Sequence, residues 1–321
     1  MNGKKMIATR EAYGNALAEF GMVYPELVVL DADLSKSTKT ATFQKKFPGR
    51  HINCGIAEGN MMAVAAGLAA TGKIVFASTF AMFAAGRAFE QVRNSVSYAH
   101  LNVKIGATHA GLSVGEDGAT HQCCEDIGLM RTIPGMVILN PSDAVEARAA
   151  VEAAIRHNGP VYLRFGRLAV PIINDAPEYK FEIGKGITLA EGGDVTLIAT
   201  GLMVPEALYA RELLAKDGIQ ARVINIHTIK PIDRSLIEKA ALETGVIVTA
   251  EEHNIIGGLG SAVCEVVAET CPVPVLRVGV EDRFGKSGPA KEVLKHYGLT
   301  AETIAEKARK ALSWRRTLAN V

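Results

Sequence analysis

The sequence predicts an α/β protein of two domains, each built on a mainly parallel β-sheet that is flanked by helices. Its 321 residues suit about two domains, because a typical domain has roughly 150 residues. Short β-branched apolar runs alternate with longer helical patterns, which is typical of a parallel sheet covered on both faces. The alternation stops between Gly166 and about Gly193 and then resumes. We therefore expect a first domain over 1–185 and a smaller second domain over 186–321.

The elements of the first domain follow from apolar periodicity. Strand candidates are 27–33, 73–79, 103–109, 136–141 and 161–165. Helical patterns lie between them, near 10–20, 57–71, 79–98, 124–131 and 143–156. The next stretch, GRLAVPIINDAPEYKFEIGKG, holds two prolines and no clear helical period. It predicts a linker followed by a hairpin.

In the second domain the same reasoning gives strands at 195–201, 221–229, 246–253 and 274–280. Helices are expected at 203–217, 233–243, 258–270, 288–296 and 301–316. The segment EEHNIIGGLGS (251–261) places glycines between a strand and a helix but lacks the G-x-G-x-x-G spacing. It therefore gives little support to nucleotide binding.

Composition excludes several classes of protein. Hydrophobic residues make up 48% of the chain and charged residues 21%, which indicates a packed globular protein rather than a disordered one. The net charge of +1 is spread along the chain, so no basic patch suggests nucleic acid or a membrane surface. No apolar run reaches the roughly 18 residues of a membrane span. Five cysteines without C-x-x-C spacing suggest neither a disulfide framework nor a zinc site, and we expect a cytoplasmic protein.

Polar residues cluster where the expected strands end. Asp31 and Asp33, the Ser78–Thr79 turn, Thr108–His109 and Arg164 each follow or close a strand. Ligands of open parallel sheets bind at the carboxyl ends of the strands. These residues are therefore expected to line one edge of the first domain.

The loop THAGLSVGEDGATHQ (108–122) is the most unusual segment. It places His109, Glu116, Asp117 and His121 within 13 residues and adds glycines that permit close backbone approach. Histidine suits proton transfer near neutral pH, so a substrate site is one interpretation. A metal site would need further ligands at a recognised spacing. The third interpretation is a loop stabilised by its own hydrogen bonds.

A single carboxylate, Glu58, stands in GIAEGNMMAV at the point where a loop enters a very apolar run. Glutamate is rarely fully buried without a partner. Glu58 therefore either faces water at a helix start or serves something that needs a carboxyl group in an apolar pocket. The segment 78–96 is expected to be a helix, and Phe80 and Phe83 near its start have the i, i+3 spacing of core residues.

Read in order, these segments resemble the C-terminal half of transketolase. The resemblance covers nearly all of the first domain and rests on ATR (8–10), DADLSKST (31–38), GIAEGNMM (55–62), STFAMF (78–83), ATHAGLSVGEDGATHQ (107–122), PSD (141–143) and LRFGR (163–167). The second domain, through AEEHNIIGGLG, is similar to the C-terminal domain of the same superfamily. The resemblance implies a pyrimidine-binding domain of a thiamine diphosphate enzyme followed by a transketolase C-terminal-like domain.

The resemblance also implies roles for the residues that face the cofactor. In this superfamily a glutamate at the position of Glu58 contacts N1′ of the aminopyrimidine. A carboxyl group in an apolar pocket tends to have a raised pKa, so it can share a proton with the ring nitrogen. Phe83 would stack on the aminopyrimidine with Phe80 beside it, and His121 would act as a proton relay near the cleaved carbon–carbon bond.

The remaining matches imply contacts with a sugar phosphate. His109 and Asp117 match residues that contact sugar hydroxyls, with His109 also close to the chemistry. Arg10, Ser37 and Arg164 match a phosphate-binding set at the mouth of the channel. Guanidinium groups suit this task because they offer paired donors to phosphate oxygens.

Two departures from the family pattern shape the expected assembly. Many relatives carry a third aromatic residue three positions after that of Phe83, where this chain has Gly86. The family binds the diphosphate through Mg²⁺ held by a GDG…N motif, whose only near match here is GEDG in the substrate loop. The resemblance therefore implies an N-terminal (alpha-type) partner subunit that carries this motif, in an α2β2 assembly.

The predicted activity is transfer of a two-carbon ketol unit from a ketose phosphate to an aldose phosphate, as in the pentose phosphate route or a specialised catabolic pathway. One alternative is the beta subunit of the decarboxylating component of a 2-oxo acid dehydrogenase. A fragment of deoxyxylulose phosphate synthase is another. A third is a non-catalytic partner that stabilises or regulates an alpha chain. The GEDGATH loop and the Arg10, Ser37 and Arg164 set favour sugar phosphates over 2-oxo acids as the substrates.

Overall fold

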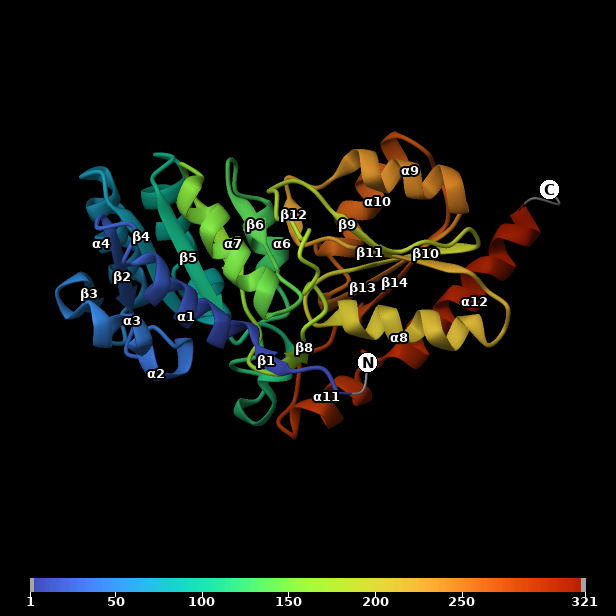
Figure 1. Cartoon of the computed structure of the whole chain (residues 1–321), viewed down its shortest axis with the longest axis horizontal. Coiled ribbons are helices and arrows are strands. Elements are labelled where there is room, and N and C mark those ends of the chain that lie inside the picture. The colour runs from blue at the N-terminus through green and yellow to red at the C-terminus, as the bar shows by residue number, and fades with distance from the viewer. Residues whose placement is uncertain (1–2, 319–321) are drawn as a thin grey trace.

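The structure, a computed structural model, describes residues 3–318. Two α/β bodies lie side by side, the N-terminal one on the left in Figure 1 and the C-terminal one on the right. A seven-stranded sheet forms the centre of the first body and a five-stranded sheet forms the centre of the second. The outermost residues of the two expected domains, 1–2 and 319–321, lie outside the described residues.

The seven-stranded sheet has the order β12-β6-β7-β5-β4-β2-β3 and is parallel except for its edge strand β12. Its buried strands are rich in β-branched residues, which suits a sheet covered on both faces. The strands are β2 (Leu27–Asp31), β3 (His51–Asn53), β4 (Ile74–Phe80), β5 (Val103–Thr108), β6 (Val137–Leu139), β7 (Val161–Arg164) and β12 (Thr228–Lys230).

Helices cover both faces of this sheet. One face packs against α1 (Thr9–Phe20), α3 (Ala41–Lys46) and α7 (Ala144–Arg156). The other packs against α4 (Glu58–Ala70), α6 (Asp126–Arg131) and the segment between β4 and β5. That segment comprises the π-helical turns η2 (Phe83–Arg87) and η3 (Val92–Ser97) with α5 (Phe89–Gln91) between them. The short elements α2 (Ser35–Thr38), η1 (Pro48–Arg50) and η4 (Leu112–Asp117) lie in connections.

The five-stranded sheet has the order β14-β13-β10-β11-β9, with only the edge strand β9 antiparallel. Its strands are β9 (Ile187–Ala190), β10 (Val195–Ala199), β11 (Ala221–Asn225), β13 (Ile247–Asn254) and β14 (Val275–Val280). The helices that follow or flank them are α8 (Met203–Ala215), α9 (Arg234–Thr244), α10 (Leu259–Glu269), α11 (Ala290–His296) and α12 (Ala301–Leu318).

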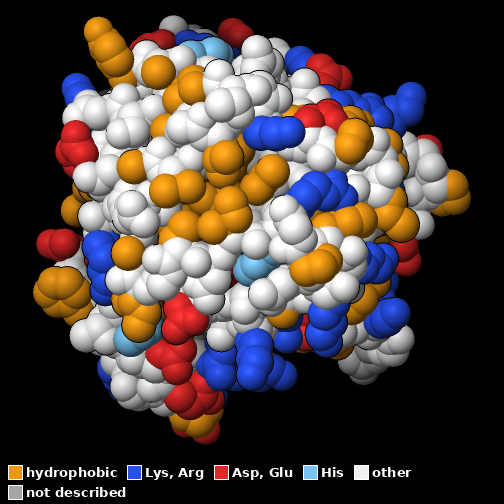
Figure 2. Space-filling model, turned by 90° about the vertical axis from the view of Figure 1, so that its left-hand side faces the viewer, with side chains coloured by type: hydrophobic (Ala, Val, Ile, Leu, Met, Phe, Trp, Pro, Cys, Tyr) orange, Lys and Arg blue, Asp and Glu red, His pale blue; other side chains and the backbone are white. Residues whose placement is uncertain are grey.

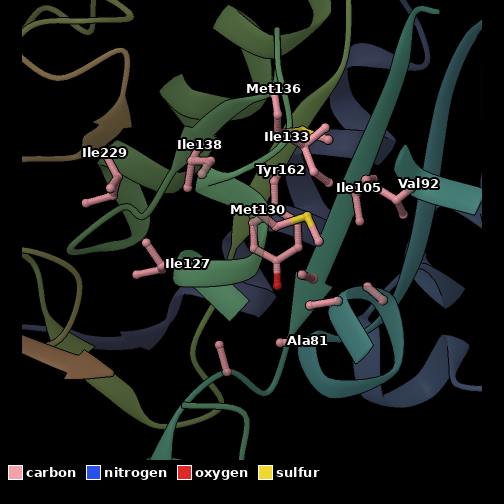
Figure 3. Close-up of a cluster of buried hydrophobic side chains, with 14 of the residues drawn as sticks. Ala81, Val92, Ile105, Ile127, Met130, Ile133, Met136, Ile138, Tyr162 and Ile229 are labelled. Carbon is pink, nitrogen blue, oxygen red and sulfur yellow. The ribbon is translucent and has the colours of Figure 1, made fainter. Parts of the chain in front are cut away.

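The hydrophobic core is continuous between the two bodies. Side chains from α6, such as Ile127 and Met130, belong to one cluster with Ile229 of β12 and Leu259 of α10. Figure 3 shows part of this cluster, with Tyr162 of β7 among the isoleucine and methionine side chains. Because β12 from the later part of the chain completes the first sheet, the two bodies share both a core and a sheet edge.

Three expectations about secondary structure are wrong. The hairpin in 166–193 does not form, because β8 (Ala169–Pro171) pairs with β1 (Met6–Ala8) and β9 pairs with β11. The single strand at 221–229 is two strands, β11 and β12, which join different sheets. The predicted helix over 78–96 begins later, because Phe80 still belongs to β4.

No helix among residues 3–318 is both long enough and apolar enough to cross a membrane.

Candidate active site

Glu58 is buried at the first position of α4 and contacts one basic residue. Its side chain is 1% exposed, and its Oε2 accepts a hydrogen bond of 2.8 Å from Nη1 of Arg87. No other described side chain donates to this carboxylate. The interpretation as a helix start that faces water is therefore wrong, and Glu58 is a buried carboxylate with one partner from η2.

Aromatic rings gather next to this carboxylate. Phe80, at the end of β4, stacks on His109 with ring centroids 3.8 Å apart and lies 5.8 Å from the parallel ring of Phe83. His121 meets the Phe83 ring edge-on at 5.4 Å. Phe80 is buried, whereas Phe83 keeps part of its ring exposed. The four side chains come from three separate segments, and the fold brings them together at the end of β4.

Arg87, the residue after Gly86, packs against the Phe83 ring. The Arg87 guanidinium lies 4.4 Å from the centroid of the Phe83 ring, a distance at which a cation is attracted to a ring face. Gly86 itself is exposed, and a Cβ there would collide with the Met82 side chain. Arg87 therefore contacts both the Phe83 ring and the Glu58 carboxylate.

Arg10 links the predicted sugar-phosphate residues. Its Nη1 lies 3.0 Å from Nε2 of His109 and donates to the backbone oxygen of Ser37 at 2.9 Å. Burial and the nearby charge of Arg167 lower the pKa of Arg10. No described carboxylate forms an ion pair with this guanidinium. The arrangement leaves a positive charge that a bound anion would neutralise.

His109 is a neutral histidine in this setting. Its backbone has φ +55°, and its Nδ1 lies 2.9 Å from Oγ1 of Thr108. Burial, followed by the charges of Arg10 and other nearby cations, lowers the pKa of His109 to about 3. A neutral ring whose Nε2 faces a guanidinium accepts a hydrogen bond from it.

Arg164 does not join this set. Its side chain is 4% exposed, its Nε donates to Asp126 at 2.8 Å, and its Nη2 donates to the backbone oxygen of Glu252 at 2.8 Å. Although burial acts to lower the pKa of Arg164, its contact with Asp126 raises it above the usual value. The expected position at the channel mouth is wrong, because the guanidinium is buried and donates to Asp126 and Glu252.

Arg167, rather than Arg164, lines a cavity together with Arg10. The antiparallel pair β1–β8 sets Ala8 opposite Ala169, so Arg10 and Arg167, two residues beyond each, come from the same end of the pair. Both line one cavity of about 470 Å³. Arg167 forms an ion pair with the exposed Glu116. The sequence contained this arginine in LRFGR, but only the pairing of β1 with β8 brings it to Arg10.

The glycine-rich loop is built by packing against the second body. Gly111, Gly115 and Gly118 all have φ between +76° and +78°, which favours glycine. A Cβ on Gly115 would lie 3.1 Å from the backbone oxygen of Gly288. Asp117 is exposed at the tip of the loop, and its charge reaches Arg10. Among residues 3–318, no group of three or more His, Cys, Asp or Glu side chains is arranged to hold a metal ion.

The glycine-rich turn before α10 is capped by a carboxylate of the same chain, Glu251. The buried Glu251 carboxylate accepts hydrogen bonds from the backbone N–H groups of Leu259 (2.6 Å) and Gly260 (2.8 Å). These are the first N–H groups of α10, which would otherwise attract an external phosphate. The chain therefore satisfies this helix start with its own side chain.

Comparison with known proteins identifies both bodies. Residues 5–172 match the family "Transketolase, pyrimidine binding domain", and residues 184–304 match "Transketolase, C-terminal domain".

The chain belongs to the transketolase family. It is 54% identical over 300 residues to a Methanocaldococcus jannaschii chain provisionally named a transketolase C-terminal section, covering 93% of this chain and 94% of that one. It is 46% identical to the 6-deoxy-6-sulfo-D-fructose transketolase subunit SqwH of Clostridium sp. (strain MSTE9), covering 93% and 92%. Human transketolase is 39% identical, but 94% of this chain covers only 49% of that protein. The chain therefore corresponds to the C-terminal section of transketolase, a transferase.

A solved structure agrees with this assignment. It is named "Split gene transketolase, inactive beta4 tetramer", is 55% identical, and superposes with a TM-score of 0.90 over 96% of this chain and 99% of that one. The family implies thiamine diphosphate as the cofactor. The residues present suit its aminopyrimidine ring, since the buried Glu58 carboxylate has one oxygen that no described side chain bonds, and Arg87 joins it to the partly exposed Phe83 ring.

Proposed function

We propose that this chain is the C-terminal, beta-type subunit of a split transketolase that transfers a two-carbon ketol unit from a ketose phosphate to an aldose phosphate. The observation that carries the proposal is the cavity in which Arg10 and Arg167 face each other beside His109. Two neighbouring guanidinium groups suit a phosphate ester, and only Arg167 of the two is paired with a described carboxylate, the exposed Glu116. The Glu58 and Phe83 pair lies close by, linked to this cavity through Phe80 and His109.

Each side chain would have a distinct task. Glu58 would bind a ring nitrogen of the aminopyrimidine and hold or return its proton, and Phe83 would pack against the ring face. Neutral His109 would accept a hydrogen bond from a sugar hydroxyl or from Arg10, and partly exposed His121 would move a proton near the reacting carbons. Asp117 would contact sugar hydroxyls from the loop tip. Arg10, Ser37 and Arg167 would bind the phosphate.

Thiamine diphosphate would supply the electron sink that makes cleavage of the carbon–carbon bond accessible. Its diphosphate would be bound through Mg²⁺, held mainly by the partner, because no GDG…N motif occurs in this sequence. We propose an α2β2 complex in the cytoplasm, with its active sites between alpha and beta chains. The five free thiols are consistent with a reducing compartment.

The partner would cover the end of the first body where β3 and α4 lie. Figure 2 looks onto this end and shows hydrophobic side chains gathered near the middle of the face. Ile56, two residues before Glu58, is 77% exposed, and Ile52 of β3 is 37% exposed. Exposed apolar groups beside a functional carboxylate support an interface at this position.

The decisive test is ketol transfer from xylulose 5-phosphate to ribose 5-phosphate in the presence of thiamine diphosphate and Mg²⁺. The chain would be assayed alone and after co-expression with a neighbouring open reading frame that encodes a GDG…N domain. We expect activity only in the pair. If a folded pair binds cofactor but fails with sugar phosphates and decarboxylates pyruvate, the proposal is wrong and the 2-oxo acid dehydrogenase alternative is favoured. A folded pair without either activity would favour a non-catalytic role.

A further inference from the structure

The second body contributes residues to the cavity that holds Arg10 and Arg167. The cavity is about 470 Å³ in volume, and one wall of it is the segment 289–292 at the start of α11. Lys291 belongs to this segment, while the first body contributes Arg10, Arg167 and Leu168 to the lining. A cavity formed at the junction of two bodies is a common place for a ligand.

The position of this wall is fixed by the substrate loop. The buried Gln122 side chain donates to the backbone oxygens of Gly115 (3.1 Å) and Lys286 (2.9 Å), so it joins the loop to the segment before α11. A Cβ at Gly115 would lie 3.2 Å from the backbone nitrogen of Ala290. The two backbones therefore pack directly against each other. The start of α11, which carries Lys291, is held against the loop in this way.

The charges in the cavity favour an anion. Three cationic side chains, Arg10, Arg167 and Lys291, line it together with two carboxylates, Glu116 and Glu292. Glu116 is already paired with Arg167. No carboxylate of residues 3–318 lies within ion-pair distance of Lys291, which is exposed. An ammonium group on a flexible four-carbon chain can follow an anion whose position varies with the length of the sugar.

We propose that Lys291, from the second domain, binds the terminal anionic group of the substrate together with Arg10 and Arg167, and so sets the preference for phosphorylated sugars. The inference rests on the proposed function and gives the second domain a part in substrate selection. It places a specificity-determining residue outside the pyrimidine-binding domain.

The test compares two lysines of one helix. Lys291→Ala removes the cation from the cavity. Lys295→Ala, one turn further along α11, changes a residue that lines the neighbouring, more apolar cavity, which Lys291 also borders, but that does not line the cavity of Arg10 and Arg167. In the assembled complex, KM would be measured for xylulose 5-phosphate and for an unphosphorylated ketose such as erythrulose, at low and high salt. Because the variant loses one charged contact at an exposed site, we expect KM for xylulose 5-phosphate to rise about tenfold.

In Lys291→Ala the KM for the phosphorylated donor should rise about tenfold relative to the KM for erythrulose, and it should depend less on salt. Lys291→Arg should restore most of the affinity because the charge is kept. Lys295→Ala should behave as the wild type. An equal change in KM for both donors, or no change, would overturn the inference.

A second readout separates this inference from the proposed function. Binding of ribose 5-phosphate to the assembled complex would be followed by phosphorus NMR, which needs no turnover. If the complex shows no ketol transfer but its binding of ribose 5-phosphate is weakened by Lys291→Ala and not by Lys295→Ala, the function is wrong and the anion site stands. Suppose instead that ketol transfer occurs. If both variants then bind ribose 5-phosphate as the wild type does, or if neither variant binds it, the role of Lys291 is wrong.

Discussion

Arg87 donates a hydrogen bond of 2.8 Å to Glu58, yet half of the arginine side chain is exposed while the carboxylate is 1% exposed. The same guanidinium lies 4.4 Å from the centroid of the Phe83 ring. Arg87 therefore approaches from the solvent side and contacts the two groups that would hold the aminopyrimidine. The ion pair partly compensates the buried charge of Glu58 and occupies one oxygen, which leaves the other oxygen for a ring nitrogen.

Glu58→Gln should abolish most turnover without unfolding the chain. The amide keeps the shape of the side chain and can still accept from Arg87, but it cannot hold and return a proton. General acid–base groups contribute about 10²- to 10⁴-fold, so we expect a loss of at least a hundredfold in kcat in the reconstituted complex. Thermal unfolding would show that the fold persists. Full activity in this variant would contradict the role given to Glu58.

Arg87→Ala should destabilise the chain in a way that cofactor reverses. The variant leaves Glu58 buried without the one side-chain donor that residues 3–318 give it, and an unsatisfied buried group costs about 1–3 kcal/mol. In the assembled complex, thiamine diphosphate and Mg²⁺ should reduce the difference in free energy of unfolding between the variant and the wild type. Chemical denaturation would measure this difference. Arg93→Ala is the control, because Arg93 is exposed in the same segment and contacts Asn94. If cofactor leaves the gap unchanged, Glu58 does not bind it.

His109 should make the stability of the chain depend on pH. Its pKa is lowered from 6.5 to about 3, so below pH 6.5 the unfolded chain takes up the proton and the folded chain does not. The stabilising contribution is complete above pH 6.5 and is lost as the pH falls towards 3. His109→Asn removes this pH-dependent contribution to stability, and asparagine tolerates the positive φ.

Between pH 7.5 and 5.5, the free energy of unfolding of the wild type should fall by about 1 kcal/mol more than that of His109→Asn. Urea denaturation at several pH values would measure both. Other buried groups, including Glu252 with its pKa raised by burial to about 7, are common to both proteins and cancel in the difference. Parallel pH profiles would mean that His109 can be protonated in the folded chain.

Replacing Arg164 by methionine should lower the stability of the chain, whereas replacing Arg167 by methionine should weaken substrate binding. Arg164→Met leaves Asp126 buried without its cation, at a cost of about 3–5 kcal/mol. Arg167→Met removes an ion pair with the exposed Glu116 and should leave the free energy of unfolding nearly unchanged, but it should raise KM for a phosphorylated substrate. Denaturation and steady-state kinetics on both variants would test this. A stable Arg164→Met protein that loses only phosphate affinity would contradict the structural role.

The sequence by itself determined the family, the succession of strands and helices, and the residue types of the site. Strong apolar periodicity made strands such as β2, β4 and β5 and helices such as α1, α4 and α7 predictable to within a few residues. The motif containing Glu58 placed a carboxylate at a helix start, because that depends on local sequence alone.

Tertiary structure decided which residues meet. Arg164 and Arg167 are three positions apart and chemically alike, yet one is buried against Asp126 and the other faces Arg10. The difference arises from the pairing of β1 with β8, which lie more than 100 residues apart in the chain, and from the position of α6 next to β7. The contribution of Lys291 arises in the same way, since α11 reaches the cavity only through its packing against the loop at Gly115. Local patterns record no such contacts, because packing between distant segments depends on the shape of the whole chain.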